Sequence, residues 1–276
     1  MSFALKELQQ IMDLATHNFG VLNLKLEEIL EIFWWMNDCD VDFSKIKIEN
    51  LCIVLYNAIR KIDNKNELFG DELVCVIRKI IDYFMEKNAS IEVASLFELI
   101  VKSLSPENLE VLVDNELIQF VIKVMKLKRG GASIIPKYYH IAIHISIACP
   151  MWESIFIQNM DVAQVKKMVS NESNDCETML VIYRWISQFS GQAYGITFFL
   201  QDSEYFTKIL CELVKNAVEP EFFQPAIIAL ENLLRLENPA IREIARSELS
   251  GCVPSMTKVH FPPDLRERWE CVQKMF

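Results

Sequence analysis

Turn-forming residues are scarce in this sequence, which has only 7 glycines and 9 prolines among 276 residues. A β-sandwich or β-barrel of many short strands needs frequent turns, so this composition argues against both. Long apolar stretches with the 3.6-residue spacing of a helix are present instead, and hydrophobic residues make up 51% of the chain. The sequence therefore predicts a folded, all-helical protein.

Several signatures of chemistry are also missing. None of the eight cysteines forms a Cys-x-x-Cys pair, and the chain has no glycine-rich phosphate loop or Gly-x-Ser-x-Gly elbow. His140 and His144 have the spacing of two metal ligands on one helix, but no HExxH glutamate or cysteine pair accompanies them. We therefore expect no catalytic residue, metal, cofactor or small-molecule substrate, and we expect the cysteines to be reduced and mostly buried.

Basic residues are outnumbered: 38 acidic and 28 basic residues give a formal charge of −10. Proteins that bind nucleic acid usually carry a basic surface, so a nucleic-acid partner is not expected. The N-terminal stretch MSFALKELQQ lacks the basic and apolar regions of a signal peptide, and the most apolar run, YYHIAIHISIACPMW, is too short to span a bilayer. These observations predict an intracellular protein, cytoplasmic or nuclear, that does not contact a membrane.

A short apolar-to-polar step recurs along the chain. It reads IFIQNMD at 155–161 and FFLQDSE at 198–204, with related steps VLVDN at 111–115 and ELFGD at 67–71. The copies begin at 67, 111, 155 and 198, which is a period of 43–44 residues. Such a period in a helical chain indicates a HEAT or armadillo array, because one small helical unit cannot bury its apolar face alone. We interpret each step as a helix end followed by the N-cap of the next helix.

The chain resembles the armadillo-type repeat family in this corner and in long-helix segments such as IYRWISQFSG at 182–191 and IIALENLL at 227–234. The resemblance implies a right-handed α-solenoid of three-helix repeats, whose third helices line a groove for a peptide or a partner helix. We expect an N-terminal capping helix over 1–22, the solenoid over 23–250 and a C-terminal capping helix over 251–276.

The resemblance also points to candidate groove residues. Import adaptors of this family carry a ladder of Trp and Asn on successive third helices. Here Asn57 and Asn232 match the Asn column, but Arg184 stands at a Trp position and the neighbouring Trp185 is expected to point inward. This departure argues against an import adaptor. Arg184 and Asn232 remain candidate partner-binding residues, with ordinary solvated side chains as the alternative.

Two tryptophans in EILEIFWWMND (28–38) are candidate interface residues. Trp34 and Trp35 are adjacent, so they cannot share one narrow stripe of a helix, and one of them is expected to be exposed at an interface. The alternative is an end helix that is buried on all sides.

Basic residues cluster in KVMKLKRGGASIIPK (123–137), where Lys126, Lys128 and Arg129 precede a Gly pair that ends the helix. They are candidate contacts for an acidic peptide or a phosphate, although helix C-termini favour basic residues in any case. Near the C-terminus, Trp269 lies on an apolar helical stripe that either caps the last repeat or docks onto a partner.

The sequence thus predicts a non-enzymatic adaptor or scaffold that binds a peptide or helix of another protein. One alternative is an obligate subunit of a larger complex, with a homodimer through the Trp34 and Trp35 end left open. The other is a divergent helical-repeat protein that binds nucleic acid or acts as an enzyme. An exposed apolar end would favour the subunit, and a continuous basic groove would favour nucleic acid.

Overall fold

The computed structural model describes residues 48–85, 90–127, 134–171, 176–255 and 262–276, together with 27, 30 and 34. All regular elements within these residues are helices, so the predicted all-helical class is confirmed for this part of the chain. The capping helix predicted over 1–22, and the candidate residues Trp35, Lys128 and Arg129, lie outside the described residues.

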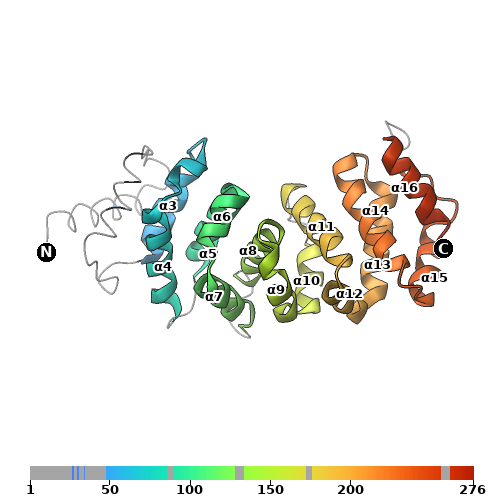
Figure 1. Cartoon of the computed structure of the whole chain (residues 1–276), viewed down its shortest axis with the longest axis horizontal. Coiled ribbons are helices and arrows are strands. Elements are labelled where there is room, and N and C mark those ends of the chain that lie inside the picture. The colour runs from blue at the N-terminus through green and yellow to red at the C-terminus, as the bar shows by residue number, and fades with distance from the viewer. Residues whose placement is uncertain are drawn as a thin grey trace, which may run out of the picture. The chain divides into compact units, whose positions relative to one another are not determined.

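Residue contacts divide the chain into two compact units, Met1–Pro150 and Met151–Phe276. The division falls inside the segment 23–250 that the sequence predicts to be one array. The first unit contains α3 (Ile48–Ile59), η2 (Lys65–Leu68), α4 (Asp71–Met85), α5 (Ile91–Ser103), α6 (Pro106–Leu112), α7 (Asn115–Met125) and α8 (Ile135–Ala148). In this unit α5 contacts both α3 and α8, while α7 contacts α4 and α8 (Figure 1).

The second unit contains a further set of helices. After η3 (Pro150–Trp152), which crosses the division, they are α9 (Glu153–Asn159), α10 (Val162–Val169), α11 (Cys176–Ser190), α12 (Ala193–Phe199), η4 (Leu200–Asp202), α13 (Ser203–Asn216), α14 (Pro220–Leu234), α15 (Pro239–Leu249) and α16 (Pro263–Gln273). Helix α14 contacts α11, α13 and α16, and α13 also contacts α15.

Aromatic side chains fill the core of each unit. In the first unit the Phe120 ring makes edge contacts with Phe97 and Tyr138, at centroid distances of 5.9 and 5.6 Å, and so joins α5, α7 and α8. In the second unit Trp185 is fully buried, as predicted, and packs on Phe189 of its own helix and on the phenylalanines of α12. Burying rings of this size is a main source of folding free energy.

Helices α11 and α12 approach each other closely at Gly195. A Cβ atom added at this position would lie 2.0 Å from the backbone carbonyl oxygen of Phe189, far inside van der Waals contact. Only glycine fits at this point, so the packing of α12 against the end of α11 requires the absence of a side chain.

The recurring polar steps form helix N-termini, as predicted. The Asp114, Asp161 and Asp202 side chains accept hydrogen bonds from backbone N–H groups in the first turns of α7, α10 and α13, respectively. Each carboxylate satisfies a donor that has no partner within the helix, which fixes the residue at which the helix starts.

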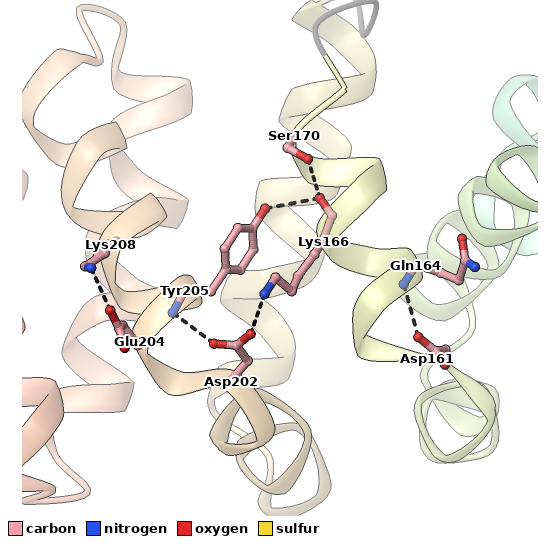
Figure 2. A network of polar contacts seen from close by, with 8 residues as sticks. All are labelled: Asp161, Gln164, Lys166, Ser170, Asp202, Glu204, Tyr205 and Lys208. Carbon is pink, nitrogen blue, oxygen red and sulfur yellow. Dashed lines mark hydrogen bonds and ion pairs between the residues drawn. The ribbon is translucent and has the colours of Figure 1, made fainter.

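Two of these caps also bind the second helix of the preceding sequence copy, 36 residues earlier. Asp114 Oδ1 caps α7, while its Oδ2 accepts hydrogen bonds from Arg78 Nε and Nη2 at 3.1 and 2.9 Å. Likewise Asp202 Oδ1 caps α13, and its Oδ2 accepts from Lys166 Nζ at 2.5 Å (Figure 2). The Lys166 ammonium also lies 4.5 Å from the centroid of the Tyr205 ring. The same two-sided carboxylate therefore occurs once in each unit.

The structure corrects two expectations. Three of the described cysteines, Cys75, Cys176 and Cys271, are exposed rather than buried, because helical spacing places them on the solvent side of their helices. The apolar run PAIIALENLLRL at 225–236 predicts a helix that begins at Pro225, yet α14 begins at Pro220 and contains Pro225 within its second turn. No described helix combines the length and the apolar character that crossing a bilayer requires.

Candidate binding site

A partly buried carboxylate, Glu98, lies on α5 where this helix contacts α8. Ser90 caps the start of α5, and apolar residues at helical spacing, including Val93, Phe97 and Ile100, face the core. The Glu98 side chain is 13% exposed. A carboxylate held this far out of water requires charged or polar partners.

Three basic side chains surround Glu98. Lys137 Nζ of α8 donates to Oε2 at 2.8 Å, and Lys102 Nζ, one turn along α5, lies 3.3 Å from Oε1. The Nδ1 atom of His140, also on α8, lies 3.2 Å from Oε1. Because an ionised carboxylate only accepts, Nδ1 donates the proton of this contact. We call these four residues, with His144 one turn further along α8, the Glu98 cluster.

The electrostatics of the cluster favour the ionised form of Glu98. Burial by itself would raise the pKa of this carboxyl, but hydrogen bonds from His140 and Lys137 and the charge of Lys102 outweigh burial and hold the pKa well below its usual range. The opposite holds for His144, where burial, followed by the charges of Lys102 and His140, lowers the pKa to about 4. At neutral pH Glu98 is therefore charged and His144 is neutral.

The Glu98 cluster has more donors than its carboxylate can satisfy. Two ammonium groups and one imidazole N–H supply about seven N–H donors, whereas a carboxylate offers about four acceptor positions. Two lysine charges face the single negative charge of the carboxylate. The Lys102 and Lys137 side chains remain 25% and 31% exposed, so their remaining donors are open to water or to a ligand.

The geometry does not suit His140 for general-base chemistry. Its Nε2 atom is buried and has no hydrogen-bond partner among the described residues. A general base must come within hydrogen-bond distance of the proton that it removes from a substrate. In the described part of the chain, no group of three or more His, Cys, Asp or Glu residues is arranged to hold a metal ion.

The second unit contains a comparable arrangement at Glu231 of α14, whose side chain is 10% exposed. Arg235, one turn along the same helix, donates to Oε1 at 2.5 Å, and Arg268 of α16 donates to Oε2 at 2.5 Å. As at Glu98, one carboxylate is enclosed by a cation from its own helix at i+4 and a cation from the neighbouring helix. We call these three residues the Glu231 cluster. It also carries an excess of one positive charge.

Two of the residues predicted to bind a partner lie on the neighbouring helices of the second unit. Arg184 is exposed on α11, and Asn232 is half-buried on α14. The Asn232 side-chain amide donates to Ser190 Oγ of α11 at 3.0 Å, so it joins the two helices. Asn232 follows Glu231 directly in the sequence, whereas Arg184 makes no polar contact with the Glu231 cluster among the described residues.

The other predicted contacts are scattered. Trp34 is 57% exposed, as an interface residue requires. Lys126 is exposed at the C-cap of α7, where it faces the negative end of the helix dipole. Trp269 is buried with Leu265 and Val272 on α16, which contacts α14, and its ring is therefore not presented to a partner.

Both clusters were missed in the sequence, apart from the observation of His140 and of Lys137 at the end of the basic segment. The available signal was a Glu followed four residues later by a cation, as in Glu98–Lys102 and Glu231–Arg235, with another cation about one repeat further on. Pairs of Glu and Lys at i,i+4 are common on helix surfaces, so this signal has little meaning until the repeat phase is known.

Comparisons of the chain with family models, with curated proteins and with solved structures give no match. The function is therefore inferred from the residues and their geometry.

Proposed function

We propose that the chain is a non-enzymatic adaptor that binds another protein through the helix faces carrying the Glu98 and Glu231 clusters. The observation that carries the proposal is the occurrence of the same costly arrangement in both units. Removing a carboxylate from water costs free energy unless charged or polar partners compensate it. Each of these two carboxylates has one cation from its own helix and one from the neighbouring helix, and the cations stay partly exposed, which supports a surface that recognises a ligand.

The proposal includes a finer description of the fold, an armadillo-like solenoid of three-helix repeats. Polar contacts within each unit join residues that are about one repeat apart, with separations of 39 for Lys137–Glu98, 42 for Asn232–Ser190 and 37 for Arg268–Glu231. The Asp114 and Asp202 side chains each accept a hydrogen bond from a residue 36 positions earlier, Arg78 and Lys166 respectively. In an array of this type α3, α5 and α8, and likewise α11, α14 and α16, would be the third helices, and their exposed positions would form the binding face.

The test is to isolate the partner. The intact, tagged protein is purified from native lysate, and bound proteins are identified by mass spectrometry together with a measurement of particle size. We expect a stoichiometric protein partner that wild-type protein retains. A particle with the mass of a single chain and no bound protein, obtained repeatedly, would contradict the adaptor.

A second candidate, an obligate subunit that self-associates, is favoured by Trp34, whose ring is 57% exposed. Large aromatic side chains are frequent anchors of interfaces. If Trp34 is an anchor, Trp34→Ala should shift the particle from dimer to monomer in sedimentation while its melting temperature at high dilution stays unchanged. Wild-type protein that sediments as a monomer at all concentrations would exclude this candidate.

A further inference from the structure

We infer that the cation pairs Lys102–Lys137 and Arg235–Arg268 each bind a carboxylate of an acidic partner peptide. The inference rests on the proposed function, which it makes specific by naming the chemistry of the partner. It also runs against the net charge of −10, which by itself would not suggest an acidic ligand.

In each cluster two cations converge on one carboxylate. In the Glu98 cluster both ammonium groups approach the same carboxylate, at 2.8 Å for Lys137 and 3.3 Å for Lys102. In the Glu231 cluster both guanidinium groups lie 2.5 Å from carboxylate oxygens of Glu231. Like charges held this close repel each other, and the single internal carboxylate compensates only one of the two. A second carboxylate would neutralise the remaining charge.

The two cation pairs also have spare hydrogen-bond donors. Each guanidinium has five N–H donors and each ammonium has three, far more than the internal carboxylate can accept. A carboxylate can then bridge the two cations with charge-assisted hydrogen bonds.

Other ion pairs in the described part of the chain differ from the two clusters in their net charge. Lys215–Glu248, at 2.6 Å, and Arg78–Asp114, at 2.9 Å, pair one cation with one anion. Such pairs are neutral and have no excess charge to offer. Lys215 and Lys137 have almost the same exposure, 30% and 31%, so the two lysines differ chiefly in what surrounds them. This makes Lys215 a matched control for Lys137, and Arg78 a control for Arg268.

The experiment measures binding of a fluorescein-labelled peptide of alternating Glu and Ala residues to the full-length protein by anisotropy, at low salt. The matching Gln–Ala peptide reports binding without charge. We expect the Glu peptide to bind, and the double variants Lys102→Gln/Lys137→Gln and Arg235→Gln/Arg268→Gln each to weaken binding by about tenfold. The controls Lys215→Gln and Arg78→Gln should leave affinity within about twofold, because each removes one charge of a neutral pair.

One further variant, Glu98→Gln, controls for misfolding, because its expected effect on affinity is opposite to that of the double variants. Glu98→Gln removes the internal negative charge, so it should tighten binding of the Glu peptide roughly severalfold, whereas a folding defect would weaken it. Equal binding of the Glu and Gln peptides, equal losses in the control variants, or weaker binding by Glu98→Gln would each overturn the inference. Tighter binding of a single-stranded oligonucleotide of the same charge would replace it with a nucleic-acid partner.

Failure of this inference can be distinguished from failure of the proposed function. If the partner isolated from lysate binds the two double variants with the same affinity as it binds the wild-type protein, the adaptor role stands and the acidic-ligand chemistry is wrong. If no protein binds wild type, the adaptor role itself is wrong, whatever the peptides do.

Discussion

The half-buried imidazole of His144 gives the protein a predicted dependence on pH. Burial lowers its pKa to about 4 in the folded protein, against 6.5 for an ordinary histidine. The unfolded chain therefore takes up a proton at a higher pH than the folded protein does. Below about pH 6.5 this difference favours unfolding, and the stability present at neutral pH is progressively lost as the pH falls towards 4.

The size of the effect follows from the two pKa values. Each pH unit between them is worth about 1.4 kcal/mol. The free energy of unfolding should therefore decrease by about 2 kcal/mol between about pH 7 and about pH 5 from His144 alone. Glu98 adds little slope in this interval, because its ordinary pKa of 4.5, which applies to the unfolded chain, and its lowered pKa in the folded protein both lie below pH 5.

Urea unfolding followed by circular dichroism at several pH values tests the prediction on wild type and on His144→Gln. The variant cannot titrate at this position, so its stability should fall by about 2 kcal/mol less over the same interval. All other groups contribute equally to both proteins and cancel in the comparison. Parallel curves for the two proteins would refute the argument that burial keeps His144 neutral.

Four substitutions in the second unit give further predictions. Gly195→Ala, whose Cβ would lie 2.0 Å from the Phe189 carbonyl oxygen, should lower stability by about 2 kcal/mol in urea unfolding, although alanine is the better helix former. The control Gly191→Ala, whose Cβ would lie 3.5 Å from Asn232 Nδ2, should leave stability nearly unchanged. Equal effects of the two substitutions would contradict the close contact at Gly195. Burial raises the pKa of Glu153 and so costs stability as the pH rises. Glu153→Gln should therefore be more stable than wild type at neutral pH and equally stable in acid, and a loss of stability at neutral pH would refute this. Asp202→Ala should cost about 1–2 kcal/mol through loss of the α13 cap, and a melting temperature like that of wild type would argue that the cap contributes nothing.

Helix positions were predictable from local signals, because caps and apolar spacing act over a few residues. The steps at 155–161 and 198–204 marked the ends of α9 and α12 and the caps Asp161 and Asp202. The exception was Pro225, since a proline at the start of an apolar run usually marks the first turn. Here Pro225 lies within the second turn of α14, where its missing N–H removes one hydrogen bond of the helix, and its ring is buried.

The polar clusters were not predictable in the same way. Glu98 and His140 are 42 residues apart, and their contact exists only because α5 packs on α8. A sequence shows the helix face on which a residue lies, but it does not show which residue of the neighbouring helix stands opposite. The pairing needs the phase of the repeat to within one residue.

The two-sided caps have a consequence for the order in which the chain assembles. Arg78 and Lys166 receive their aspartate partners only after 36 further residues have followed them. During synthesis from the N-terminus, each of these cations is therefore made before its aspartate partner. The Arg78–Asp114 and Lys166–Asp202 contacts can form only after the starts of α7 and α13, respectively, have been synthesised.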